Sequence, residues 1–217
     1  MPKQSGMLTL EQLKAQATNN EVNTVLVVFT DQYGRFLGKR LDVDFFLESA
    51  LEKGVGACNY LLTTDMQMNP MPGYDYANWQ KGYGDFVLVP DLLTLRLASW
   101  LDKTALVICD VYADERQQEK VNLAPRSVLT KQVEKAKALG FNLKAASELE
   151  YYIFEQSYKD AAKKNYQDLA EIGWYIEDYH VLQGSREEKL NGAARQHLKQ
   201  SGIAVEKLER GVGAWPT

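Results

Sequence analysis

The segment from Thr104 to Tyr112 places the strongest constraint on what this chain of 217 residues can fold into. Its residues Ala-Leu-Val-Ile-Cys are apolar at successive positions and do not alternate with polar residues. A β-strand with one face in water shows that alternation, whereas a strand covered on both faces does not. We therefore expect Thr104–Tyr112 to be a strand that is buried on both faces.

Other strand and helix patterns surround this segment. The β-branched apolar run Asn23–Phe29 is followed by the turn sequence Asp-Gln-Tyr-Gly and by a second strand at Arg35–Val43, which together predict a β-hairpin. Further strands are expected at 86–89 and 93–97, and capping residues with helical spacing predict helices at 9–16 and 44–53. The first half of the chain is therefore predicted to be a small α+β unit.

Composition excludes several classes of protein. The net charge is −4 without a basic block, which argues against a nucleic-acid partner. Cys58 and Cys109 are too few and too far apart for a disulfide scaffold or a CxxC metal site, so a reducing, cytoplasmic compartment is expected. The first residues lack an apolar signal core, and no stretch reaches the roughly 20 apolar residues that span a bilayer. We expect a soluble protein without a membrane partner.

The segment from Tyr60 to Asp85 has a different character. It contains prolines, glycines and several aromatic residues with little periodicity. A long irregular segment inside a compact domain is usually functional or mobile. Asp65, Trp79 and Asp85 are its notable side chains, although an aromatic residue in such a loop is more often there for packing.

The second half begins with a helix from Pro125 to Leu139 that Gly140 ends. Strands are expected at 141–144, 145–154 and 203–206, and a last clear helix at 186–200. Because helix and strand follow one another twice, this half is predicted to be part of a larger α/β sheet.

Two carboxylates interrupt the expected strand at 145–154. Glu148 and Glu150 are two residues apart, so in a strand both side chains point to the same face. One interpretation is an edge strand whose acidic face is solvated. The other is a site for a hard cation, since Mg²⁺ is bound by one or two carboxylates together with substrate phosphates.

Taken together, the motifs of this chain resemble those of the glutamine synthetase family, in particular its type-III-like and γ-glutamylamine-forming ligases. They occur in the family's order and spacing across residues 20–206. The matching elements are Thr30-Asp31 with Gly34, Gly38-Lys39, the run Tyr60–Asp85, Gly84-Asp85, Pro90-Asp91, Leu95-Arg96, Trp100, Cys109-Asp110, Pro125-Arg126 and Ser147-Glu148-Leu149-Glu150-Tyr151-Tyr152. Ala98-Ser99 departs from relatives that often carry a proline before the tryptophan.

The resemblance implies a domain organisation. A leading helix at 1–18 would precede a β-grasp domain at 19–112. Residues 113–206 would form the incomplete start of a catalytic α/β domain. The expected fold class is therefore α+β.

The resemblance also implies a reaction. In this family ATP phosphorylates the γ-carboxylate of glutamate, and ammonia or an amine then attacks the γ-glutamyl phosphate. Divalent cations neutralise the charges that meet there. Glu148 and Glu150 match metal-binding carboxylates of the family, with Mg²⁺ or Mn²⁺ as the expected ion.

Two further residues match family positions. Glu206 matches a glutamate at the nucleotide site, although without the family it is an ordinary acid at a strand end. Asp65 matches an aspartate that binds and deprotonates ammonium in a neighbouring subunit's site, a task that suits a carboxylate. Local sequence gives Asp65 an equally good interpretation as the cap of a turn.

The last residues, 207–217, do not follow the family pattern. Relatives continue approximately Asn-Ser-Lys-Gly-Glu-Trp-Gly-Xaa-Gly-Gln-His-Glu, whereas this chain reads Lys-Leu-Glu-Arg-Gly-Val-Gly-Ala-Trp-Pro-Thr. A coding sequence exists for the observed tail in which removal of one base restores the family motif. We therefore expect an out-of-frame tail after Glu206, and no ligase activity from the chain as printed.

Three functions follow from these observations. The first is an ATP-dependent glutamate–ammonia ligase that makes glutamine. The second is a γ-glutamylpolyamine or other γ-glutamylamide synthetase with a small amine as acceptor. The third is a non-catalytic fragment that associates with full-length subunits, because this family builds rings of identical subunits with sites between neighbours.

Overall fold

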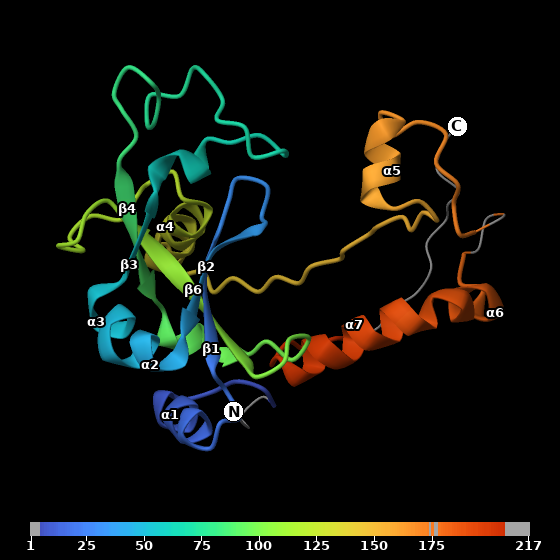
Figure 1. Ribbon diagram of the computed structural model, residues 1–217, viewed down its shortest axis with the longest axis horizontal. Coiled ribbons are helices and arrows are strands. Elements are labelled where there is room, and N and C mark those ends of the chain that lie inside the picture. The colour runs from blue at the N-terminus through green and yellow to red at the C-terminus, as the bar shows by residue number, and fades with distance from the viewer. Residues whose placement is uncertain (1–4, 174, 176–177, 207–217) are drawn as a thin grey trace. The chain divides into compact units, whose positions relative to one another are not determined.

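The computed structural model describes residues 5–173, 175 and 178–206. They form two compact units. The first runs up to Leu143 and includes Lys199–Ile203, and the second contains Lys144–Leu198 and the described residues from Ala204 onward. Strands in the first unit and helices in both make the protein a mixed α/β structure (Figure 1).

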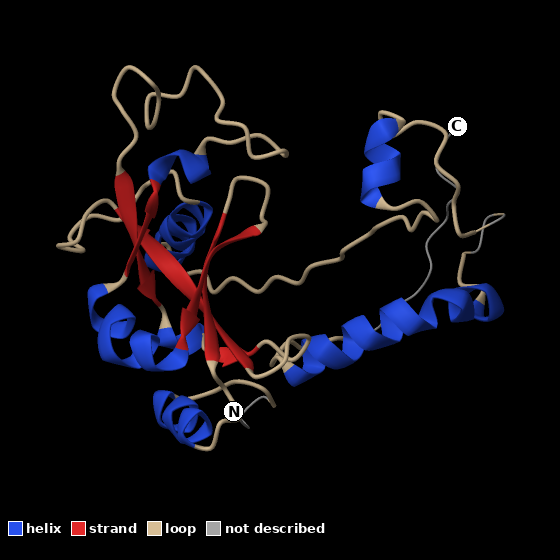
Figure 2. Cartoon of the chain, viewed as in Figure 1, coloured by secondary structure: helices blue, strands red, loops and turns tan. Residues whose placement is uncertain are grey.

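The first unit is built on a six-stranded sheet with the order β2-β1-β6-β4-β3, in which β5 also pairs with β6 (Figure 2). The strands are β1 (Thr24–Thr30), β2 (Phe36–Asp42), β3 (Val55–Cys58), β4 (Asp85–Pro90), β5 (Arg96–Leu97) and β6 (Thr104–Tyr112). β1 and β6 are parallel, with Val27 opposite Val107, and the other pairs are antiparallel. The predicted hairpin is confirmed by the antiparallel pairing of β1 with β2.

Strand β6 is covered on both faces, as its unbroken apolar sequence predicts. Val107 and Cys109 lie in the larger core of the unit. Leu106 points to the opposite face and packs in a smaller cluster with Val28 and Ala98. Burying one such aliphatic side chain contributes about 1.5–3 kcal/mol, so the strand anchors two apolar layers at once.

The strand expected at 93–97 is shorter than predicted. Residues Leu92–Thr94 form the 3₁₀ turn η3, and only Arg96–Leu97 pair with β6 as β5. The turn is stable because the Asp91 carboxylate accepts a hydrogen bond from Leu93 N at 3.0 Å. In addition, the Thr94 hydroxyl oxygen accepts one from Ile108 N at 2.8 Å. Side-chain hydrogen bonds therefore replace the strand pairing that apolar residues alone would favour.

The predicted helices of the first unit are present, but the stretch expected at 44–53 is capped by Asp42, two residues before its predicted start. Helix α1 (Leu10–Thr18) starts at a capping box between Thr9 and Gln12. The helical stretch after β2 consists of α2 (Val43–Phe45), the π-helical turn η1 (Phe46–Ala50) and α3 (Leu51–Lys53), and the 3₁₀ turn η2 (Asn59–Leu62) follows β3. Helix α4 (Pro125–Ala138) starts on a proline, which is a favoured first residue.

Two glycines of this unit lie against neighbouring backbone. Gly54 ends the helical stretch at φ +74°, and a Cβ there would lie 2.8 Å from the Leu88 carbonyl oxygen. A Cβ on Gly38 of β2 would lie 2.0 Å from the carbonyl oxygen of Val27. Only glycine allows the chain to pass this close to β1 and β4.

The second unit contains short helices: α5 (Tyr158–Lys163), α6 (Val181–Gly184), the 3₁₀ turn η4 (Ser185–Glu187) and α7 (Glu188–Gln200). The predicted helix at 186–200 is confirmed by α7, which the turn η4 precedes. Among the described residues of this unit, β pairing is limited to an isolated bridge between Phe154 and Glu171.

The strands expected at 141–144, 145–154 and 203–206 are wrong for the structure as described. Apart from the bridge at Phe154, these residues have no regular secondary structure, and most are exposed; Leu149 keeps 84% of its surface in water. A strand is stable only when neighbouring strands satisfy its backbone groups. The described part of the chain supplies no such neighbours, so apolar alternation does not produce a strand here.

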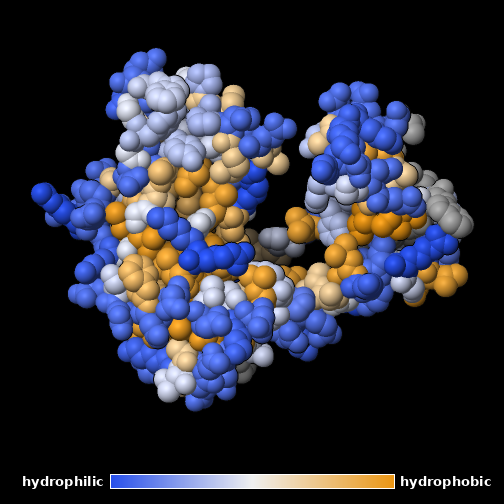
Figure 3. Space-filling view, viewed as in Figure 1, coloured by the Kyte–Doolittle hydropathy of each residue, from blue (hydrophilic) through white to orange (hydrophobic). Residues whose placement is uncertain are grey.

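Large apolar side chains remain exposed on the first unit. Figure 3 shows hydrophobic residues gathered over the sheet on the face turned to the viewer. A hollow of about 370 Å³ on the sheet is lined by Leu26, Val28, Phe36, Trp100 and Leu106 together with other residues of β2. Among the described residues, no helix has both the length and the apolar composition to cross a membrane.

Candidate functional site

The irregular segment 63–84, which we call the Asp65 loop, connects η2 to β4 (Figure 1). The Asp65 carboxylate accepts hydrogen bonds from Gln67 N at 2.8 Å, Asn69 N at 2.9 Å and Asn69 Nδ2 at 3.0 Å. The side chain therefore caps its own turn, which is the structural interpretation of this residue. The same bonds give the carboxylate a fixed direction.

Electrostatics keep Asp65 ionised. The hydrogen bond from the Asn69 side chain lowers the pKa of the Asp65 carboxyl below its usual range, and the Asn69 and Gln67 backbone amides and the charge of Arg35 act in the same direction. A carboxylate held in its charged form attracts a cation. Asp65 is thus suited to bind an ammonium group, and the capping role and the binding role are compatible.

Two aromatic residues of the loop, Trp79 and Tyr83, form a chain of ring contacts with Tyr60 of η2. Tyr60 and Tyr83 meet edge to face with ring centres 5.6 Å apart, and Trp79 contacts Tyr83 in the same way at 5.4 Å. Trp79 is nevertheless 83% exposed. The ring contact described for Trp79 is the one with Tyr83. Asp85, the other side chain singled out in this segment, is the exposed first residue of β4. Trp79 therefore stiffens the loop and leaves most of its own ring in water.

Glu148 and Glu150 are exposed and lie on a stretch without regular structure. Tyr151 follows directly, and its hydroxyl donates to Oδ1 of Asn191, which is buried in α7. This hydrogen bond ties the stretch to α7 within the second unit. Sequence reasoning missed Asn191, because the contact joins residues 40 positions apart.

The acidic pair has suitable chemistry for a hard cation but no complete ligand set. Two carboxylates are appropriate oxygen ligands for Mg²⁺ or Mn²⁺. However, the described residues contain no group of three or more His, Cys, Asp or Glu side chains that could hold a metal ion. The pair therefore does not form a metal centre by itself in this part of the chain.

Glu206 is the last described residue, and it is exposed outside any helix or strand. No ion pair is described for it within residues 5–173, 175 and 178–206. Its match to a nucleotide-site glutamate stays a prediction. The tail expected to be out of frame, 207–217, lies outside the described residues.

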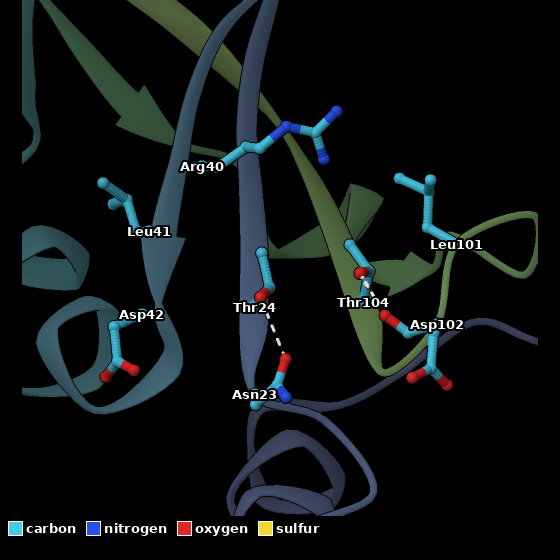
Figure 4. A pocket seen from close by; sticks show the side chains of 8 residues that line it. All are labelled: Asn23, Thr24, Arg40, Leu41, Asp42, Leu101, Asp102 and Thr104. Atoms are coloured by element: carbon cyan, nitrogen blue, oxygen red, sulfur yellow. Dashed lines mark hydrogen bonds between the residues drawn. The ribbon is translucent and has the colours of Figure 1, made fainter.

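A hollow of about 600 Å³ lies elsewhere, at one end of β1, β2 and β6 (Figure 4). Arg40 projects over it from β2, with the carboxylates of Asp42 and Asp102 at its other side. It is open, and Thr24 and Thr104 use their hydroxyls for local hydrogen bonds to Asn23 and to the Asp102 carbonyl. None of the predicted site residues lines it, so it is separate from the candidate site.

Three motif pairs singled out in the sequence meet in an ion-pair network. Arg126 of α4 donates to Asp110 of β6 at 2.8 Å and to Asp91 at the start of η3. Lys120 donates to the other oxygen of Asp110 at 2.7 Å, and this hydrogen bond raises the pKa of Lys120. The network joins α4 to the sheet, so Pro90-Asp91, Cys109-Asp110 and Pro125-Arg126 have a structural role here.

Replacing Arg126 with methionine should lower the free energy of unfolding of the first unit by about 2 kcal/mol, because two half-buried carboxylates lose a charged hydrogen-bond donor. Urea unfolding followed by circular dichroism measures the change. Lys131→Met on the exposed face of the same helix is the matched control and should change stability by less than about 0.5 kcal/mol. Equal losses of stability in the two variants would contradict the role of Arg126 in joining α4 to the sheet.

Comparisons with known proteins agree with the resemblance in the sequence. Residues 122–214 match the family described as Glutamine synthetase, catalytic domain. A gamma-glutamylethanolamide synthetase of Streptomyces coelicolor is 36% identical over 93% of this chain and 43% of its own length. A glutamate–isopropylamine ligase of Pseudomonas sp is 30% identical over 90% of this chain and 43% of its own length. The chain thus spans less than half the length of these relatives.

Solved structures agree on the fold. A novel glutamine synthase homolog superimposes with a TM-score of 0.61 over 88% of this chain and 41% of its own, at 16% sequence identity. A structure titled Apo GmaS without ligand gives a TM-score of 0.59 over 87% of this chain and 39% of its own, at 14% identity. These likenesses support the fold. The similarity to the two curated relatives extends over most of the chain, and the family match identifies residues 122–214 as part of the glutamine synthetase family.

Proposed function

We propose that this chain is the amino-terminal part of an ATP-dependent ligase that joins the γ-carboxyl group of glutamate to a small organic amine. The observation that carries the proposal comes from two relatives, 36% and 30% identical, which match 93% and 90% of the chain: one is named for an ethanolamide product and the other for isopropylamine as the amine joined to glutamate. Ammonia, the acceptor expected first from the sequence, becomes the second candidate. A type-1 glutamine synthetase of Dictyostelium discoideum is also similar, at 26% identity.

The domain organisation is part of the proposal. We assign residues 1–18 to a leading helix, 19–112 to a β-grasp domain and 113–206 to the start of the catalytic domain. The hairpin β1–β2, the helical stretch after it and the return of the chain as β6, parallel to β1, support the β-grasp assignment. Residues 207–217 are proposed to be out of frame, although the family match continues from 122 to 214 without a break at Glu206.

In this proposal Asp65 receives the amine. A primary alkylamine is protonated at neutral pH, and an ionised carboxylate binds that cation. Because its hydrogen bonds lower the pKa of Asp65, the carboxylate is a weak base towards a free ammonium ion. It would therefore hold the cation first. One proton must then pass from the ammonium group to the Asp65 carboxylate, because the nitrogen has no lone pair until it is deprotonated. The neutral amine would attack the γ-carbonyl carbon of the γ-glutamyl phosphate, phosphate would leave, and the new amide nitrogen would lose its second proton to the released phosphate.

Glu148 and Glu150 are proposed to hold a divalent cation, Mg²⁺ or Mn²⁺, with ligands from the part of the family's length that this chain does not span. The ion would neutralise the phosphate and carboxylate charges that meet during phosphoryl transfer. Glu206 is proposed to lie at the ATP site. A ring of identical subunits, in which the Asp65 loop faces a neighbour, completes the proposal.

The experiment begins with the gene. Sequencing past the codon of Thr217 decides whether a second reading frame encodes the family motif, and the continuous protein is then expressed. Supplied with glutamate, ATP and Mg²⁺, it should release ADP at least tenfold faster with ethanolamine or isopropylamine than with ammonium at equal concentration, a preference of about 1.4 kcal/mol.

Each outcome of this amine panel has a definite meaning. Faster turnover with ammonium would return the assignment to glutamine formation. No ADP release with any amine would reject the ligase proposal for this protein. The chain of 217 residues is the control and should show no amine-dependent ADP release, because among the residues that the structure describes its acidic pair has no complete ligand set.

A further inference from the structure

Arg35, at the end of the turn between β1 and β2, joins two distant segments of the first unit. Its Nε donates to Asp31 Oδ2 at 2.6 Å. Its Nη1 donates to the carbonyl oxygen of Met66 at 2.6 Å and its Nη2 to that of Asp65 at 3.3 Å. All three guanidinium nitrogens are therefore engaged, one towards the hairpin and two towards the Asp65 loop.

The hairpin side of this contact is rigid. Asp31 is 1% exposed, and its Oδ1 accepts hydrogen bonds from Tyr33 N and Arg35 N, both at 2.9 Å. The turn thus holds the carboxylate, and the carboxylate holds the guanidinium. The Tyr33 ring also lies 5.2 Å from the guanidinium carbon, in a cation–π arrangement. Arg35 consequently reaches the loop in one fixed orientation.

On the loop side, the two accepting carbonyls belong to Asp65 and to the residue that follows it. The Asp65 carbonyl also accepts a hydrogen bond from Met68 N at 3.1 Å, which closes the turn. The side chain of Asp65 is held separately by Gln67 and Asn69. Arg35 therefore fixes the main chain at Asp65, and the loop's own amides fix the carboxylate relative to that main chain.

We propose that Arg35 is the positioning residue of Asp65: it holds the loop backbone so that the carboxylate presents one orientation to the incoming amine. This inference rests on the role assigned to Asp65 in the proposed function. It adds a residue from a different part of the chain, 30 positions away.

The geometry requires arginine rather than any cation. A guanidinium offers five N–H donors in a planar fork and so reaches a carboxylate and two carbonyls at once. A lysine ammonium is a point charge on a flexible stem, and from this position it can keep the ion pair with Asp31 but not both loop contacts. Arg35→Lys therefore retains the charge and removes the fork.

The test compares Arg35→Lys, Arg35→Met and the control Arg40→Met in the 217-residue chain, Arg40 being an exposed arginine of β2, the strand that follows Arg35. NMR gives two readouts: the titration of the Asp65 carboxyl carbon and the exchange rate of the Met68 amide hydrogen. In both Arg35 variants we expect the pKa of Asp65 to return towards its usual range. The Met68 amide should exchange roughly 10- to 100-fold faster, as the loss of charge-assisted hydrogen bonds implies. Arg40→Met should leave both unchanged.

Two results would overturn the inference. In the first, Arg35→Lys leaves the pKa of Asp65 and the exchange rate of the Met68 amide unchanged, while Arg35→Met changes the pKa. Arg35 would then act by its charge alone. In the second, a folded Arg35 variant changes neither the pKa of Asp65 nor the exchange rate of the Met68 amide. Arg35 would then have only a general stabilising role. Should Arg35→Met not fold, Arg35→Lys decides by the same criteria. Neither readout needs turnover, so the result for Arg35 remains valid if the amine panel shows no ligase activity. Likewise, a negative result for Arg35 does not affect the outcome of the amine panel.

Discussion

Replacing Phe86 with alanine is expected to destabilise the first unit by about 3–5 kcal/mol. Phe86 is fully buried in β4, and its ring meets that of Phe29 in β1 edge to face with centres 5.2 Å apart. The substitution removes this contact and leaves a cavity between two strands that flank β6. Domains of this size are stable by only about 5–15 kcal/mol, so much of the stability is lost.

Urea unfolding at constant slope measures this change, with Phe36→Ala as the matched control. Phe36 lies on the outer strand β2 and is 51% exposed, so its truncation should cost under about 1 kcal/mol. A Phe86→Ala midpoint equal to that of Phe36→Ala would mean that the core is not organised around the Phe29–Phe86 pair.

The second large effect concerns Glu148. In the continuous protein that the amine panel requires, Glu148→Gln or Glu150→Gln should lower kcat for amine-dependent ADP release at least 100-fold, about 2.7 kcal/mol. The amide has nearly the shape of the carboxylate but no charge, so it binds a divalent cation weakly. The apparent Mn²⁺ dissociation constant, measured by calorimetry, should rise at least tenfold as an independent readout.

Glu155→Gln is the control for this pair. Glu155 is an exposed glutamate of the same unit, so the substitution makes the same chemical change close by. It should leave both kcat and Mn²⁺ affinity within about twofold of the unaltered protein, since surface substitutions away from a site usually have small effects. If Glu148→Gln behaves like Glu155→Gln, the solvated-face interpretation of the acidic pair is correct.

The fold of the first unit could be predicted because its signals are local. Thr9 and Gln12 cap α1, the turn at 31–34 closes a hairpin, and the apolar run at 105–109 marks the strand that is covered on both faces. Each of these depends on residues close together in the chain. Periodicity and turn chemistry report such relations reliably.

The strand predictions at 141–154 failed for a physical reason. Strand formation depends on a partner, and apolar alternation carries no information about whether the partner is present. Among the described residues the stretch around Glu148 has no neighbouring strand, so its backbone remains open to water. The two carboxylates stand out in the sequence, but their geometry does not follow from spacing alone, and their role stays a prediction.

The candidate site was found only in part for a related reason. Asp65 was identified from its place in a motif, whereas Arg35 was not, because its contact spans 30 residues. The one available signal was a charged residue directly after a turn that begins with an aspartate. Asp31 and Arg35 are four residues apart and form an ion pair in which the carboxylate is buried, a pairing that points to a fixed turn.

The parallel pairing of β1 with β6 affects how the protein emerges from the ribosome. Val27 pairs with Val107, so the sheet cannot close until about eighty more residues have been synthesised. At roughly 5–20 residues per second the hairpin waits several seconds with one apolar edge unpaired. Contacts of such long sequence separation also slow folding itself. Chaperone demand during synthesis should therefore be greatest before Ile108 leaves the exit tunnel and fall once β6 joins β1.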